Sequence, residues 1–144
     1  MGPECGTSLL NGVGLGFANR VRRGHVGLVA ASGTGLQEVS TLVHRLGAGV
    51  SQGIGTGGRD LHEDVDVIAT LQALSWLGRD AETRVIGIVS KAPSGPVGAR
   101  VLAASVMTDK PVVAYLPGWL GTPPPGVVMA PTLEAAAVAC VRGL

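Results

Sequence analysis

The stretch that decides the fold is HVGLVAASGTGLQEVS, which runs from His25 to Ser40. Its apolar run from Val26 to Ala31 is typical of a strand buried on both faces of a parallel sheet. Ser32-Gly33-Thr34-Gly35 interrupts the run, and apolar residues then recur at helical spacing from Leu36. The stretch therefore predicts a strand, a glycine-rich turn and a helix start. Because the first N–H groups of a helix have no acceptor within it, such a turn is a candidate anion site.

The same alternation of strand and helix patterns continues along the chain. Strands are expected at 26–31, 49–54, 84–89, 111–116 and 127–130, and helices at 36–46, 60–77, 97–107 and 133–142. Short connections between such units predict an open parallel sheet with helices on both faces. We therefore predict a three-layer α/β/α fold whose five parallel strands have the flavodoxin-like order 2-1-3-4-5. In that order the crevice lies between the carboxyl ends of the first and third strands.

Length and composition restrict the organisation and the function classes. A chain of 144 residues is most simply one domain, and we expect an irregular lead-in over 1–24 before a sheet domain over 25–144. The net charge of +1 without a basic stripe disfavours nucleic-acid binding. No apolar stretch reaches membrane-spanning length, so we expect a cytoplasmic protein that binds no membrane. Cys5 and Cys140 make neither a disulfide framework nor a zinc site.

Two glycine-rich turns are the best candidates for a binding site. The second, Gly55-Thr56-Gly57-Gly58-Arg59, follows the second predicted strand and so lies at the same edge of the sheet as the first. The first turn is neither a Walker A loop nor a GxGxxG motif. The anion-binding candidates are Ser32, Gly33, Thr34, Gly35, Gly55, Thr56, Gly57, Gly58 and Arg59. The alternative is that the glycines only make tight turns, with Ser32 or Thr34 as a helix cap.

Other polar residues near this edge each have a structural interpretation as well as a functional one. Ser90 and Lys91 follow the third strand at the predicted crevice, where Lys91 is either a positive charge for an anionic ligand or a solvated surface residue. An acidic group with one histidine suggests a metal site; its members are Asp60, His62, Glu63, Asp64 and Asp66. Acids are favoured in the first turn of a helix, so we predict no metal there. No spacing identifies a catalytic residue.

Five segments of the chain resemble the FdrA family, and together they span nearly its whole length. They are MGPECGT at 1–7, LGFAN at 15–19, VGLVAASGTGLQEVS at 26–40, IGTGGRDL at 54–61 and KPVVAYLPG at 110–118. FdrA proteins are similar to succinyl-CoA synthetase, and this piece resembles its alpha-type, flavodoxin-like ligase domain. The resemblance implies that the helix after Ser32 holds a phosphoryl group at its N-terminus, that 55–58 flanks it, and that Glu38 matches a glutamate of synthetase alpha chains. A CoA-binding Rossmann domain normally precedes this piece, and the given sequence contains none.

One departure from the synthetase pattern concerns the catalytic histidine. In succinyl-CoA synthetase a histidine after the fourth strand carries the phosphate, whereas residues 117–126 here read PGWLGTPPPG. The phosphohistidine relay is therefore not carried over. FdrA-type proteins also lack it, and the resemblance to them implies a component of carbamoyl transfer to oxamate, with partner subunits.

The expected function is thus a phosphoryl-anion-binding part of a ligase-like or carbamoyl-transfer enzyme. CoA or carbamoyl phosphate would be a substrate of the full assembly, and no cofactor would be bound covalently. The expected partners are a CoA-binding domain and a similar ligase-type domain, either a second copy or a beta-like chain. Two alternatives stay open. One is a non-catalytic dimerisation or interaction domain. The other is a flavin or nucleotide binder, which the aromatic content of 3% disfavours.

Overall fold

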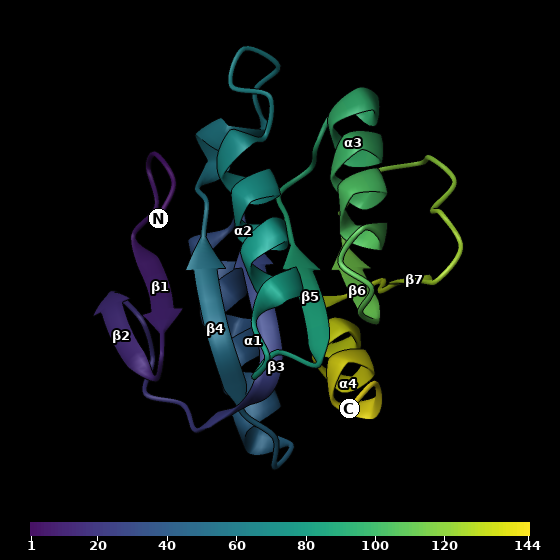
Figure 1. Cartoon of the computed structure of the whole chain (residues 1–144). Coiled ribbons are helices and arrows are strands. Elements are labelled where there is room, and N and C mark those ends of the chain that lie inside the picture. Colours follow the sequence, from purple (N-terminus) through teal and green to yellow (C-terminus); the bar gives the residue numbers. More distant parts are fainter.

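The computed structural model describes all 144 residues, which form seven strands and four α-helices around one mixed sheet (Figure 1). The strands are β1 (Thr7–Leu10), β2 (Val13–Gly16), β3 (Arg23–Ala30), β4 (Val50–Gly55), β5 (Val85–Val89), β6 (Val112–Tyr115) and β7 (Val127–Met129). The helices are α1 (Gly33–Arg45), α2 (Ile68–Arg79), α3 (Gly95–Val106) and α4 (Leu133–Arg142), with one 3₁₀ turn, η1 (Gly58–Leu61).

The strand order is β2-β1-β4-β3-β5-β6-β7. The five strands from β4 to β7 in this order are mutually parallel and, counted along the chain, are arranged 2-1-3-4-5. The prediction of a sheet with only five strands, all parallel, is nevertheless wrong. β1 pairs antiparallel with both β2 and β4, which makes the sheet seven-stranded and mixed.

The extra strands come from residues 1–24, where an irregular lead-in was expected. β1 and β2 form a hairpin whose two-residue turn has φ of 51° at Asn11 and 83° at Gly12. Positive φ at both positions is the type I′ geometry that matches the twist of a tight hairpin. The sequence pattern missed the hairpin because every residue of β2 is exposed, so no burial period marks it. Its place in the sheet depends on the contact of Leu9 with Gly53 of β4.

Two helices cover each face of the sheet (Figure 1). Leu28 and Ala30 of β3 pack in the cluster that holds α1 and α4, whereas Val29 packs in the cluster that holds α2 and α3. This burial on both faces is the reason why β3 reads as a continuous apolar run. The core is aliphatic, with no aromatic residue among its buried members. None of the helices is both long and apolar enough to cross a membrane.

Helix α2 begins later than the sequence predicted. A helix from Asp60 was expected, but Asp60 lies in η1 and α2 starts at Ile68. Residues 62–67 form the connecting turns, and Val67 has a left-handed φ of 53° directly before the helix. Because each helix follows a parallel strand, the turns before α1, η1 and α3 all lie at the carboxyl edge of that sheet.

Candidate functional site

The N-terminus of α1 leaves backbone donors free at the carboxyl end of β3. Ser32 is the N-cap, and its hydroxyl accepts a hydrogen bond of 3.1 Å from the Gly35 N–H. The N–H groups of Gly33 and Thr34 have no acceptor within the chain. Their partial positive charges and the helix dipole favour a negative group at this point. The capping interpretation of Ser32 is therefore confirmed, while the next two residues keep their donors.

The turn after β4 is divided between internal contacts and free donors. Gly55 N–H donates to the Ser8 hydroxyl at 3.1 Å, and Thr56 N–H donates to the Ala30 carbonyl at 2.8 Å. Gly55 and Thr56 are buried, and the Gly2 N–H bonds to the Gly55 carbonyl at 2.9 Å. These two candidates consequently have no N–H group left for a ligand. The N–H groups of Gly57, Gly58 and Arg59 have no acceptor within the chain.

Lys91 reaches from the end of β5 to the turn after β4. It follows β5, yet a Cβ placed on Gly58, after β4, would lie 2.7 Å from Lys91 Nζ. In the sheet β3 lies between β4 and β5, so the Lys91 side chain spans the exit of the strand that leads into α1. Neighbouring strands are about 4.8 Å apart, and a lysine side chain is long enough to cross one of them. A side chain at position 58 would displace the ammonium from this position.

The other charged residues at this edge differ in their availability. Arg100 is engaged with Asp66 at 2.7 Å, which is the one salt bridge of the chain. Arg59 is exposed, and neither it nor Lys91 has a carboxylate within salt-bridge distance. Glu38 is exposed on α1 and forms no hydrogen bond with the turns. Lys91 and Arg59 are therefore the two cations of this edge that are free to pair with a ligand.

A buried carboxylate of the chain itself occupies the N-terminus of α2. The Asp60 oxygens accept hydrogen bonds from Ala69 N–H at 2.9 Å, Thr70 N–H at 2.8 Å and the Thr70 hydroxyl at 2.6 Å. Asp60 is fully buried. The helix-start acid predicted from the sequence thus acts as a cap from eight residues before the helix. Because α2 already holds an anion, its N-terminus is not available to a ligand, whereas the first turns of α1 and α3 keep free donors.

Ser90 adds an unused hydroxyl at the carboxyl end of β5. It is 6% exposed, and its Oγ is buried without any hydrogen-bond partner. Buried hydroxyls are nearly always paired, so an unpaired one next to Lys91 is a candidate ligand contact. Thr7 is a residue that the sequence did not suggest, because it lies in the supposedly irregular lead-in. A Cβ on Gly33 would be 3.5 Å from Thr7 Oγ1.

The loop after β6, where synthetases carry their histidine, packs on α3 instead. Trp119 Nε1–H donates to the Gly95 carbonyl at 3.1 Å, and the indole covers Gly98. An open groove of about 410 Å³ lies beside it, lined by Pro93, Gly95, Ala99, Gly118, Trp119, Leu120, Gly121 and Thr122. This groove starts two residues beyond Lys91 and is large enough for a small organic group.

The geometry brings one thiol to this edge, because Cys5 Sγ lies beside Gly55 of the second turn. Burial raises the pKa of the Cys140 thiol to about 12, which leaves it protonated and inert on the buried face of α4. Cys5 is half-buried, and its thiol donates to the Thr7 carbonyl at 3.1 Å. No three His, Cys, Asp or Glu side chains come together as a cation site. The arrangement is suited to binding an anion without forming a bond to it.

Comparison with known proteins finds sequence similarity to a subunit of a CoA ligase. No family model matches the chain. It is 50% identical over 113 residues to the uncharacterized protein YahF of Escherichia coli K12, covering 78% of this chain and 22% of YahF. It is 28% identical over 129 residues to the alpha subunit of an ADP-forming succinate–CoA ligase of Aquifex aeolicus, covering 88% of this chain and 40% of that subunit.

The chain therefore spans about a fifth of one relative and two fifths of the other. Neither relative is named as an FdrA protein, so membership of that family stays a prediction. The similarity to the ligase subunit supports a CoA-ligase-like domain.

Proposed function

We propose that this chain is the part of a CoA-ligase-like enzyme that holds a phosphoryl-type anion at the N-terminus of α1. The observation that carries the proposal is the position of Lys91, whose ammonium lies across the end of β3 beside Gly58. Gly33 and Thr34, whose N–H groups are free, are the first residues of α1 and follow the end of β3. Two kinds of donor, neutral amides and an ammonium, would then surround one small negative group.

The ligand would be bound and oriented rather than attacked by this domain. Backbone N–H groups suit the oxygens of a phosphate, while Lys91 and Arg59 neutralise its charge. An acyl phosphate or carbamoyl phosphate presents such a group together with a reactive carbonyl. We propose that the acceptor, the nucleotide and CoA are brought by other parts of a longer or multi-subunit enzyme. The ligase relative is named as a subunit, and this chain spans only 40% of it.

Replacing Lys91 with methionine tests the proposal directly. Lys91→Met keeps the length of the side chain and removes the charge, so phosphate and carbamoyl phosphate should bind about tenfold more weakly, the loss expected for one charge-assisted contact. The measurement is isothermal titration calorimetry at low ionic strength, with unfolding followed by circular dichroism. The free energy of unfolding should hardly change, because Lys91 is exposed.

A matched charge control is Arg84→Met. Arg84 is exposed before β5, at the opposite end of that strand, and its removal lowers the net charge by the same unit. Binding should be unaffected beyond a small general electrostatic change. The proposal is refuted if neither anion binds the original chain, or if both variants weaken binding equally.

A further inference from the structure

The outer edge of the sheet is unusually unprotected. β2 is the terminal strand and has only β1 beside it (Figure 1). The residues from Cys5 to Asn19 include no Asp, Glu, Lys, Arg or Pro. Edge strands of monomeric proteins usually carry a charge, a proline or a covering loop that prevents pairing with another strand. β2 has none of these, so its edge is open to another strand.

The main chain of β2 shows which groups are open. Phe17 N–H bonds to the Gly6 carbonyl at 2.9 Å, so Phe17 faces β1 with its peptide groups. In an antiparallel pair alternate residues bond to the same neighbour, so the N–H and C=O groups of Gly14 and Gly16 point away from β1. Gly16 has a φ of 66°, and the pairing continues through it to Phe17. The open groups therefore belong to two glycines with no side chains in the way.

The large side chains of this segment share one face of the hairpin. Val13, Leu15 and Phe17 alternate with the glycines and are 61%, 37% and 78% exposed. Leu15 and Val13 lie opposite Ser8 and Leu10 of β1, and Leu10 packs with the cluster of α2 and α3. On the other face of the hairpin, helix α1 packs against β1. Helix α2 makes no comparably extensive contact with β1 or β2 (Figure 1). Three apolar side chains thus stand uncovered beside an open strand edge.

We propose that β2 pairs antiparallel with β2 of a second copy of this chain, about a two-fold axis that passes beside Leu15. In this register Gly14 lies opposite Gly16 of the other copy, and the two glycine pairs form four main-chain hydrogen bonds. Leu15 meets its own copy, and Val13 meets Phe17 of the other chain. The two sheets become one continuous sheet.

The segment itself favours its own copy as the occupant. A two-fold contact brings the same patch together from both chains, so the patch must be self-complementary. A neutral strand has no like charges to oppose, and an aromatic residue opposite a β-branched one is a stabilising cross-strand pair. A charged partner would find no opposite charge between Cys5 and Asn19. The contact is independent of the anion site, because Lys91 and α1 take no part in it.

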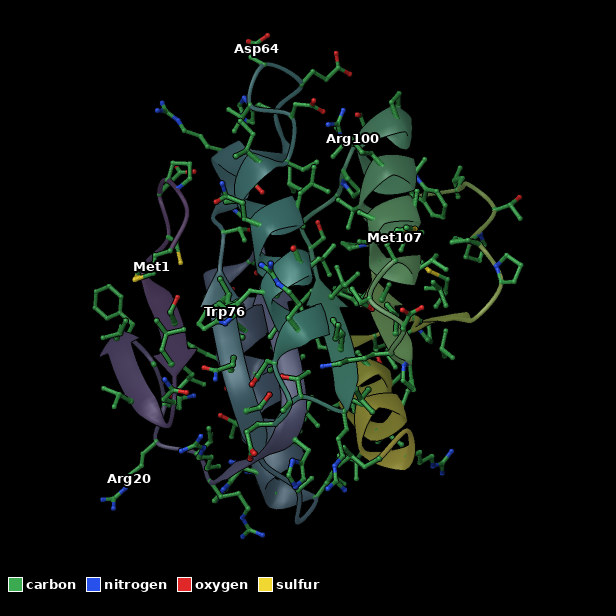
Figure 2. The ribbon with its side chains drawn as sticks, viewed as in Figure 1. Met1, Arg20, Asp64, Trp76, Arg100 and Met107 are labelled. Carbon is green, nitrogen blue, oxygen red and sulfur yellow. The ribbon has the colours of Figure 1, made fainter.

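A disulfide test reports the predicted register. At the two-fold axis the Leu15 residues form a non-hydrogen-bonded pair, whose Cα atoms are about 4.5 Å apart, within the range that a disulfide spans. Under mild oxidation Leu15→Cys should give a covalent dimer in high yield, with residue 15 joined to residue 15 in the peptide mass map. Met107→Cys is the control, because Met107 is 82% exposed at the C-terminal end of α3, away from the hairpin (Figure 2). It should give little covalent dimer under the same oxidation.

A second variant tests whether dimerisation depends on the β2 edge in particular. Leu15→Lys places two ammonium groups opposite each other, so the dimer dissociation constant measured by sedimentation equilibrium should rise at least tenfold. Met107→Lys should leave it unchanged. A chain that is monomeric at about 100 µM, or a dimer that tolerates Leu15→Lys, overturns the proposal. Anion binding measured on the same samples should be equal in both variants, so a failure of this surface is distinct from a failure of the anion site.

Discussion

At the scale of single residues, Ser90 and Asp60 show two different fates of a buried polar group. Asp60 is fully buried and all its hydrogen bonds are satisfied by the start of α2. Ser90 is buried at the carboxyl end of β5 without any partner. A buried group that is satisfied contributes to stability, whereas one that is not costs free energy until a ligand or water pairs with it. The two residues therefore predict opposite outcomes of mutation.

Ser90→Ala should stabilise the free chain or leave its stability unchanged while it weakens anion binding. Removing an unpaired buried hydroxyl recovers up to about 1 kcal/mol. The lost contact should weaken phosphate binding about threefold to tenfold, as measured by calorimetry beside thermal unfolding. Ser105→Ala is the control, since its hydroxyl is equally buried but donates to the Leu102 carbonyl at 2.8 Å. A Ser90→Ala chain that binds phosphate normally would remove Ser90 from the site.

Asp60→Asn should destabilise the chain by about 2–3 kcal/mol, because an amide replaces a carboxylate that accepts three hydrogen bonds. The NH₂ group of asparagine would face a donor of Ala69 or Thr70. Urea unfolding followed by circular dichroism measures the change. Asp64→Asn, at the exposed tip of the same loop (Figure 2), should change stability by less than about 0.5 kcal/mol. Equal effects of the two variants would contradict the capping role.

At the scale of elements, α2 is fixed at both ends by charged side chains from outside the helix. The Asp60 carboxylate holds the first turn, and Lys110 Nζ donates to the Leu77 and Asp80 carbonyls at 2.7 Å each. Burial lowers the pKa of Lys110, and the neighbouring Asp80 charge partly opposes this shift. An anion at the N-terminus and a cation at the C-terminus both match the helix dipole. The two contacts set the position of α2 along the sheet.

The distance of α2 from the sheet depends on a glycine of β3. A Cβ on Gly27 would lie 2.6 Å from Thr83 Cγ2 and 3.0 Å from Leu77 Cδ2. Gly27→Ala should therefore destabilise the chain by about 1–3 kcal/mol through overpacking. Gly95→Ala is the matched control, because nothing lies within 4 Å of its Cβ position at the start of α3. Thermal unfolding of both variants checks this, and equal midpoints would contradict close packing at Gly27.

At the scale of the whole molecule, charge is distributed along the strand direction. Basic residues lie in the last turns of three helices, namely Arg45 of α1, Arg79 of α2 and Arg142 of α4. Acidic residues gather in the loop of 62–67, at the opposite end of the strands. Figure 2 shows Asp64 at the tip of this loop and Arg20 at the basic end of the molecule. The candidate site lies at the acidic end. Lys91 and Arg59 are thus local cations in otherwise unfavourable surroundings for an anion, which makes their charge decisive there.

The amino-acid sequence by itself determined the alternation of parallel strands and helices and limited the cap of the first helix to Ser32 or Thr34. Apolar period, glycine turns and caps are local properties, so they can be read from neighbouring residues. The tertiary structure alone decided three other features: the hairpin at the sheet edge, the reach of Asp60 to α2, and the passage of Lys91 over β3. Each depends on which strands lie side by side, because strand order brings together residues far apart in the chain. The glycine-rich turn at 32–35 was visible in the sequence, but its neighbours were not.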